Sequence, residues 1–165
     1  MATKAVVDSG PIIHLSEIGL FMALSSYDVI IPEAVYSEIT KRGAPGKKEV
    51  LSLPIEKLTA GEKEYTALLI EKYGLGLGEA EVLSIARYRK IGIVFVDDLD
   101  AREAATSLGL KPHGSVGILL RAYRAKILSK KDTIDGLHAL VEDSSLFVTR
   151  YLIEEAVKAV ERYMD

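Results

Sequence analysis

The segment Ala-Val-Val-Asp-Ser-Gly-Pro at residues 5–11 decides the fold, together with Ile-Gly-Ile-Val-Phe-Val-Asp-Asp at residues 91–98. Each segment contains a continuous apolar run that ends in an acidic residue. Buried parallel strands have this pattern, because helices cover both faces of such a sheet. Ligands bind outside the carboxyl ends of these strands. We therefore expect Asp8, Asp97 and Asp98 at a functional edge of a parallel sheet.

The rest of the chain alternates between short apolar runs and helical segments. We expect strands at residues 4–8, 27–31, 91–96 and 110–111, and a minor edge segment within 51–58. Helices are expected at 11–19, 33–42, 59–73, 79–90, 99–109, 116–126, 132–141 and 149–163. Thr59 with Glu62 three residues later is a capping-box start. The alternation predicts a single three-layer α/β domain over residues 1–165, with a parallel sheet of four to five strands flanked by helices.

Two further acids are expected at the same edge as Asp8 and Asp97. The helix that begins at Glu79 rises roughly 18 Å, and the strand that follows returns about 20 Å, so Glu79 comes back to the level of Asp97. Glu38 lies about two turns into the helix after the second strand. Carboxylates gathered at one place repel one another unless some are protonated or a divalent cation neutralises them. The cluster indicates metal-assisted chemistry on a phosphate ester.

Each acid also has an ordinary structural interpretation. Glu79 in a first turn complements the helix dipole. Asp98 or Asp100 is well placed as an N-cap, and capping is our preferred interpretation for at least one of them. Glu38 taken alone is typical of a solvated helix face. Asp8 has no structural role that the sequence reveals, so the cluster is more informative than its members.

Other motifs give weaker signals. The Gly-Leu-Gly-Leu-Gly run at residues 74–78 lacks the lysine and Ser/Thr of a P-loop, and we interpret it as a flexible hinge before Glu79. The histidines at 14, 113 and 138 have no zinc-type spacing and are interpreted as ordinary helix or loop residues. A basic loop around Lys41 and residues 42–48 is typical of a solvated surface, with phosphate contact as the alternative.

The composition excludes several classes of protein. The chain has 165 residues and a net charge of −3, which argues against coating nucleic acid by bulk electrostatics. It has no cysteine, which excludes disulfides and thiolate metal sites. Asparagine and glutamine are also absent while Lys and Glu are abundant, a thermophile pattern. The uncharged stretch at 18–27 is too short to span a bilayer, and no signal peptide is recognisable, so we expect a cytoplasmic protein.

The acidic motifs resemble those of the PIN domain. The matching segments are Val-Val-Asp-Ser-Gly-Pro-Ile-Ile at 6–13, Ile-Pro-Glu-Ala-Val-Tyr-Ser-Glu-Ile at 31–39, Gly-Glu-Ala-Glu at 78–81 and Val-Asp-Asp at 96–98. More narrowly, the chain is similar to an uncharacterised prokaryotic PIN-like family related to VapC toxins, including its Gly-Ser-Val-Gly-Ile-Leu segment at 114–119. PIN proteins are typically Mg²⁺- or Mn²⁺-dependent ribonucleases, and VapC toxins are neutralised by an antitoxin.

The resemblance implies roles for individual residues. Asp8 and Asp97 would hold Mg²⁺ or Mn²⁺ directly, with Glu38, Glu79 and Asp98 completing the ligand set or positioning water. Ser9, Lys41 and Arg102 would contact the substrate. The family usually has Asp where this chain has Glu79, and many members have Thr or Ser where it has Phe95; both departures bear on catalytic efficiency.

The expected partners follow from the same resemblance. We expect single-stranded or structured RNA as substrate, a small antitoxin as a potential partner, and a homodimer. The last helix, with an apolar stripe from Leu152 to Tyr163, or the helix at 116–126 would provide the dimer surface.

Two alternatives to an endoribonuclease remain open. The first is a PIN-like regulatory module that binds RNA or protein with weak or no catalysis. The second is a receiver-like signalling domain, whose paired acids also hold Mg²⁺. In receivers, however, the acidic pair follows the first strand and a lysine completes the site, whereas here the pair follows the third central strand.

Overall fold

The computed structural model describes residues 2–163 and contains one five-stranded sheet in the order β3-β2-β1-β4-β5. All neighbouring strands within it are parallel. The strands are β1 (Thr3–Val7), β2 (Tyr27–Pro32), β3 (Ile55–Glu56), β4 (Ile93–Phe95) and β5 (Lys111–His113). The predicted three-layer α/β fold with four to five parallel strands is confirmed.

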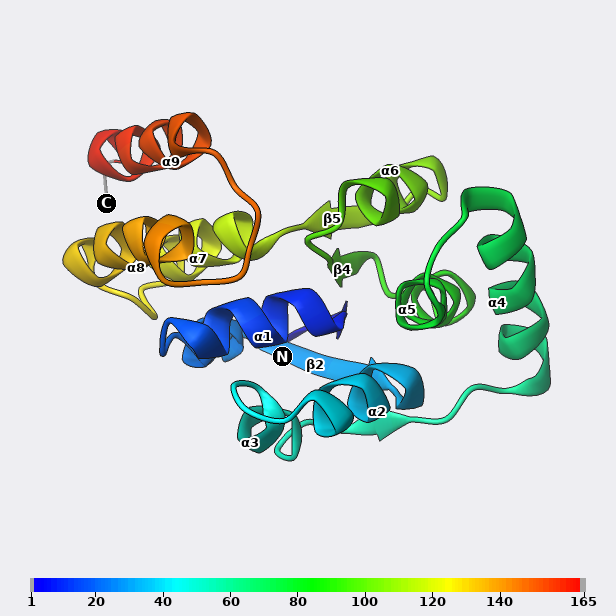
Figure 1. Ribbon diagram of the computed structural model, residues 1–165. Coiled ribbons are helices and arrows are strands. Elements are labelled where there is room, and N and C mark those ends of the chain that lie inside the picture. Colours follow the sequence, from blue (N-terminus) through cyan, green and yellow to red (C-terminus); the bar gives the residue numbers. More distant parts are fainter. Residues whose placement is uncertain (1, 164–165) are drawn as a thin grey trace.

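Helices cover both faces of the sheet. They are α1 (Ser9–Glu17), α2 (Glu33–Arg42), α3 (Lys47–Val50), α4 (Ala60–Tyr73), α5 (Leu77–Tyr88), α6 (Leu99–Ser107), α7 (Ser115–Arg124), α8 (Lys130–Glu142) and α9 (Arg150–Arg162), with a 3₁₀ turn at Phe21–Leu24. Figure 1 shows α4, α5 and α6 on one side of the strands and α1, α7 and α8 on the other. Within residues 2–163, every helix is too short or too polar to cross a membrane.

The strand order reverses between β1 and β4, which places a topological switch point at their carboxyl ends. Val7 lies opposite Phe95 in the register, and the Asp8 amide donates to the Phe95 carbonyl at 2.9 Å. Val7 and Phe95 are fully buried, as both faces of a central parallel strand should be. Asp8 and Asp97 therefore leave neighbouring strands side by side.

The connection between α4 and α5 is shorter than the predicted hinge. Gly74 ends α4 with a positive φ of 67°, and Gly76 is the N-cap of α5 with extended backbone. The α5 helix thus begins at Leu77, two residues earlier than predicted, and Gly78 is helical. The Glu79 carboxylate accepts from the Gly76 amide at 3.1 Å, which stabilises the earlier start. Helix α3 and the 3₁₀ turn were not predicted, because both are single turns.

The face of α9 that packs inside the molecule overlaps only in part with the apolar stripe predicted from the sequence. Ile153, Ala156 and Val160 are buried, and α9 packs on α7 and α8. The Tyr163 ring lies 5.6 Å from the Tyr123 ring of α7. Of the predicted stripe, Ala156 and Val160 are buried, whereas Leu152, Ala159 and Tyr163 are exposed. The homodimer stays a prediction.

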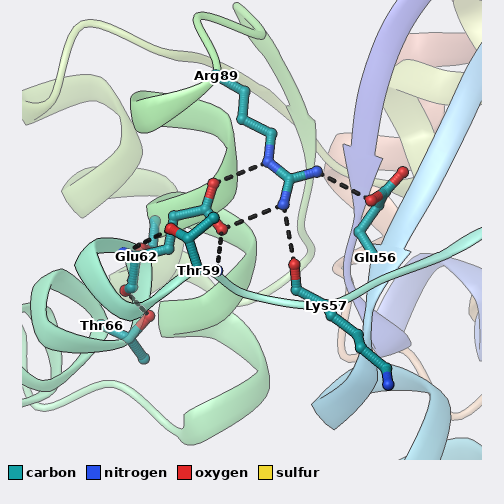
Figure 2. A network of polar contacts seen from close by, with 7 residues as sticks. Glu56, Lys57, Thr59, Glu62, Thr66 and Arg89 are labelled. Carbon is teal, nitrogen blue, oxygen red and sulfur yellow. Dashed lines mark hydrogen bonds and ion pairs between the residues drawn. The ribbon is translucent and has the colours of Figure 1, made fainter.

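Arg89, at the end of α5, fastens this helix to the first turn of α4 and to β3 (Figure 2). Its guanidinium donates to both carboxylate oxygens of Glu62, at 2.8 and 3.1 Å, to Glu56 at 3.0 Å and to the Lys57 carbonyl at 3.0 Å. The hydrogen bonds from Arg89 hold the pKa of the buried Glu62 below its ordinary value. Glu62 also accepts from the Thr59 amide, which completes the predicted capping box. The network holds in place the helix that carries Glu79.

Replacing Arg89 with Met should lower the free energy of unfolding by about 3 kcal/mol, because it leaves the buried Glu62 carboxylate without its cation. For a chain of this size the loss corresponds to a melting temperature roughly 10 °C lower. The control Lys131→Met removes an exposed ion pair with Asp135 and should melt like the wild type. Equal melting of Arg89→Met and Lys131→Met would contradict the assigned role.

The effect of Arg89→Met should also depend on pH. Because the folded pKa of Glu62 is depressed, the ion pair contributes its full stability above the ordinary pKa of 4.5, and the contribution is lost as pH falls through the folded pKa. The difference in melting temperature between wild type and Arg89→Met should therefore be largest near neutral pH and shrink below pH 4.5. A constant difference from pH 7 to pH 3 would contradict this prediction.

Candidate active site: an acidic cleft at the sheet edge

A cleft of about 1140 Å³ opens at the carboxyl ends of β1 and β4. It is lined by six carboxylates: Asp8, Glu38, Glu79, Asp97, Asp98 and Asp100. The acids come from the ends of two strands and from helices α2, α5 and α6. The structure thus brings every acid of the predicted ligand set to one cleft. Ser9 and Lys41 also line it, whereas Arg102 does not.

Asp8 has the most unusual environment of these acids. Asp8 is only 6% exposed, and its Oδ1 has no hydrogen-bond partner in the described part of the chain. It sits at the N-cap position of α1 but makes no side-chain capping bond. Burial raises the pKa of Asp8 to about 7; the charges of Glu79, Glu38 and Asp97 add to the rise, and the Ser9 backbone amide opposes it. A buried oxygen without a partner, close enough to three other acids for their charges to raise its pKa, is suited to bind a cation.

Asp97 is held by three hydrogen bonds. Its Oδ1 accepts from the Ser115 amide at 2.6 Å, and its Oδ2 accepts from the Ser115 hydroxyl at 2.6 Å. The His14 Nδ1 lies 2.7 Å from Oδ2. Ser115 is the first residue of α7, so the positive end of that helix faces the carboxylate. The interpretation of His14 as an ordinary helix residue was therefore wrong: His14 lines the cleft and orients Asp97.

Glu79 both caps helix α5 and lines the cleft. One carboxylate oxygen caps α5 at the Gly76 amide, and the other, Oε2, is buried without a partner among the described residues. Burial raises the pKa of Glu79, with further repulsion from Asp98 and Glu38. The capping interaction explains the length of this side chain, because a glutamate at the third helical position reaches back to the N-cap amide.

Glu38 and Gly78 complete this side of the cleft. A Cβ atom added to Gly78 would lie 3.4 Å from Glu38 Oε2 and 3.6 Å from Asp8 Oδ1, so both oxygens flank the same glycine. Glu38 is exposed on α2. The start of α2 is fixed by Glu81, whose carboxylate accepts from the Ala34 amide at 3.0 Å. The two acids of α5 thus have different roles: Glu79 lines the cleft, and Glu81 binds the start of α2.

Asp98 and Phe95 have structural roles. Asp98 is the N-cap of α6 and accepts from the Ala101 amide at 2.9 Å, as the capping interpretation predicted. Phe95 is fully buried, packs edge-on against the Tyr27 ring at 4.9 Å, and does not line the cleft. Its departure from the family pattern therefore changes the core beneath the site, and leaves the lining of the cleft unchanged.

The residues of the cleft fit a divalent cation by their chemistry. Within residues 2–163, no three His, Asp or Glu side chains are grouped closely enough to hold an ion directly. The buried Asp8 Oδ1 and Glu79 Oε2 are nevertheless oxygen donors without partners in this part of the chain. Mg²⁺ prefers oxygen donors and keeps several waters, so it needs only one or two carboxylates from the protein. The direct ligand set stays a prediction.

Gly114 determines how closely α7 approaches Asp97. A Cβ atom at this position would lie 2.8 Å from Asp97 Oδ1 and 3.3 Å from Arg102 Nη1. The backbone of Gly114 has φ −90°, which alanine adopts without strain. The glycine is required by space alone, because an added methyl group would displace the carboxylate from the Ser115 amide.

Gly114→Ala should therefore destabilise the protein by roughly 1–3 kcal/mol through overpacking. Gly117→Ala is a matched control, because its nearest contact would be an ordinary 3.5 Å and alanine favours the helix interior. In thermal unfolding with a chelator present, Gly114→Ala should have the lower melting temperature of the two variants. If Gly114→Ala melts at or above Gly117→Ala, the close packing of α7 on Asp97 is wrong.

The fold and cleft together define a parallel α/β domain with an acidic site at its switch point. Over residues 4–162 the chain matches the family DUF3368, described as a PIN domain. The chain therefore belongs to the PIN-domain family. No curated protein and no solved structure matches it.

Several contributors to the site were not predicted from the sequence. His14 and Ser115 lie 83 and 18 residues from Asp97, and no local pattern links them to it. A weak signal existed for Ser115, because it follows a glycine at the start of a predicted helix, and helix amino termini attract anionic groups. For His14, the spacing of one helical turn from Gly10 would have placed both on one face of α1.

Proposed function

We propose that this protein is a divalent-metal-dependent endoribonuclease that hydrolyses RNA phosphodiester bonds in the acidic cleft. PIN domains are generally nucleases, so membership of the family supports a nuclease in the coarse sense. The observation that supports the finer proposal is the buried Asp8, whose Oδ1 has no partner among the described residues and whose pKa is raised in part by the charges of Glu38, Glu79 and Asp97. Such a carboxylate is costly to the folded protein unless a cation or a proton neutralises it.

Asp8 and Asp97 would hold Mg²⁺ or Mn²⁺, with Glu38 and Glu79 adding to the ligand set. A bound ion of this kind lowers the pKa of water and neutralises charge on a phosphate. The chain's own residues do the positioning. Ser115 and His14 fix the orientation of the Asp97 carboxylate, which limits the rearrangement that binding requires.

Two residues at the cleft are suited to contact RNA. Ser9 follows Asp8 directly, and Lys41 of α2 provides the one lysine or arginine among the described residues that line the cleft. Arg102 was also expected to contact the substrate, but it does not line the cleft; its Nη1 lies beside Gly114, the glycine on which Asp97 Oδ1 also packs.

Several finer expectations belong to this proposal. They are a cytoplasmic location, a thermophilic host, a homodimer, and a role as the toxin of a toxin–antitoxin pair. Light scattering at micromolar concentration tests the dimer, and a small reading frame beside the gene tests for an antitoxin.

A PIN-like module that binds RNA or protein without turnover is the second candidate, favoured by the absence of a preassembled group of three ligands within residues 2–163.

The test of the proposed function is cleavage of single-stranded RNA by the wild-type protein with Mn²⁺ or Mg²⁺. Chelation should stop the cleavage, and addition of excess metal should restore it. Absence of cleavage with both metals and several RNA sequences would favour the binding module.

A further inference from the structure

Phe147 is the most exposed large apolar residue in the described part of the chain, with 95% of its surface accessible, and it lines the acidic cleft. It lies in the segment between α8 and α9. Two more exposed apolar residues, Leu77 at the start of α5 and Leu99 at the start of α6, line the same cleft at 57% and 69% exposure. The cleft thus combines acids in its lining with apolar side chains that remain open to solvent.

The Phe147 ring is presented by an anchored backbone. Glu17 of α1 accepts hydrogen bonds from the Ser145 amide and hydroxyl, at 3.0 and 2.7 Å. On either side of Phe147, Leu146 and Val148 are half-buried against the core. The neighbours of Phe147 therefore point inward while its own ring points outward. An apolar ring held in water beside a functional cleft indicates a binding surface.

The charges in the cleft decide what this surface binds. Six carboxylates line it, and Lys41 is the one lysine or arginine among its described lining residues. Most proteins that bind nucleic acid gain affinity from lysine and arginine contacts to phosphates. This cleft offers Lys41 alone for such contacts among its described lining residues, so much of the binding energy for RNA has to come from an uncharged part of the nucleotide. The face of a base stacks on an aromatic side chain without involving the phosphate charge.

We propose that Phe147 is a stacking platform for an unpaired nucleobase next to the bond that is cut. The inference rests on the proposed function. Bases in a duplex are stacked on both faces, so only an unpaired base can lie on the ring. Leu77 and Leu99 would contact the neighbouring nucleotides through their apolar surfaces.

The test is the affinity of a short single-stranded RNA, measured by fluorescence anisotropy with Mn²⁺ in the Asp97→Asn background, which suppresses turnover. Phe147→Ala should raise Kd about tenfold, within the range of one stacked base, and Phe147→Trp should restore the affinity. Tyr151→Ala is the matched control. Tyr151 is an aromatic residue four positions away with 73% exposure, and it does not line the cleft. This control should bind RNA like its parent.

Two further RNAs separate stacking from other contacts. An RNA with abasic residues at its centre should bind Phe147→Ala and its parent equally, because the base that stacks has been removed. A duplex of the same sequence should bind weakly to both. In the cleaving wild-type background, Phe147→Ala should raise KM and leave kcat nearly unchanged, since stacking is made equally in the ground and transition states.

The proposal is overturned if Phe147→Ala keeps its parent's affinity, if Tyr151→Ala loses as much, or if no variant binds single-stranded RNA. It is also overturned if Phe147→Ala changes only self-association in light scattering, because the ring is then a protein contact. If the wild type does not cleave RNA, the binding series is repeated on the wild-type background. Loss of affinity in Phe147→Ala would then support the platform although the nuclease function had failed.

Discussion

Asp97→Asn should reduce the rate of metal-dependent RNA cleavage about a thousandfold or more, equivalent to a barrier higher by roughly 4 kcal/mol. The substitution removes a negative charge at the cleft and keeps the shape of the side chain. It is also compatible with the surroundings of Asp97. The Asn oxygen still accepts from the Ser115 amide, while the Ser115 hydroxyl and His14 are both able to accept from the new amide group.

The control for Asp97→Asn is Glu103→Gln, which removes one negative charge from an exposed position on α6 outside the cleft. Glu103→Gln should cleave RNA like the wild type, and both variants should melt within a few degrees of it. Equal cleavage by wild type and Asp97→Asn, purified identically, would assign the activity to a contaminant or to another site.

Asp8→Asn should abolish the stabilisation of the protein by Mn²⁺ and raise the stability of the metal-free protein. In the absence of metal, burial and the nearby charges of three acids raise the pKa of Asp8 to about 7, which reflects a cost to the folded state. The neutral amide removes most of this cost but is itself buried, so we expect a net gain of about 1–3 kcal/mol in chelator. Wild type should gain several degrees in melting temperature with Mn²⁺, and Asp8→Asn should not.

Asp28→Asn is the matched control for Asp8→Asn, because Asp28 is an exposed aspartate near the opposite, amino-terminal end of a neighbouring strand. It should leave both the metal-free melting temperature and the Mn²⁺ response unchanged. The account of the cleft is wrong if Asp8→Asn binds Mn²⁺ as tightly as the wild type, or if it melts well below the wild type in chelator.

The sequence alone predicted the sheet and the gathering of acids because both depend on strong local patterns. A continuous apolar run that ends in Asp8 or Asp97 indicates a buried parallel strand, and strand and helix lengths then determine which ends meet. The capping box of Thr59 and Glu62 was readable for the same reason, since all its atoms come from four consecutive residues.

The contacts that orient the acids were not predictable in this way. His14 and Ser115 meet Asp97 only because α1 and α7 pack beside one strand end, and such contacts depend on the tertiary arrangement. The exposed ring of Phe147 carries no periodic signal, because it lies in a short connection between two helices. The start of α5 was misplaced because glycines predict a break in a helix. The hydrogen bond from the Gly76 amide to the Glu79 carboxylate lets the helix begin earlier in the chain, at Leu77.

The most direct test of the central claim is a Mn²⁺ titration in which thermal stabilisation and RNA cleavage are measured on the same preparations of wild type and Asp8→Asn. If the ion that binds the acidic cleft is the ion that supports cleavage, both wild-type curves should reach half-saturation at the same Mn²⁺ concentration, and both responses should be absent in Asp8→Asn. RNA cleavage that persists in chelator, or that saturates equally in Asp8→Asn, would contradict the account.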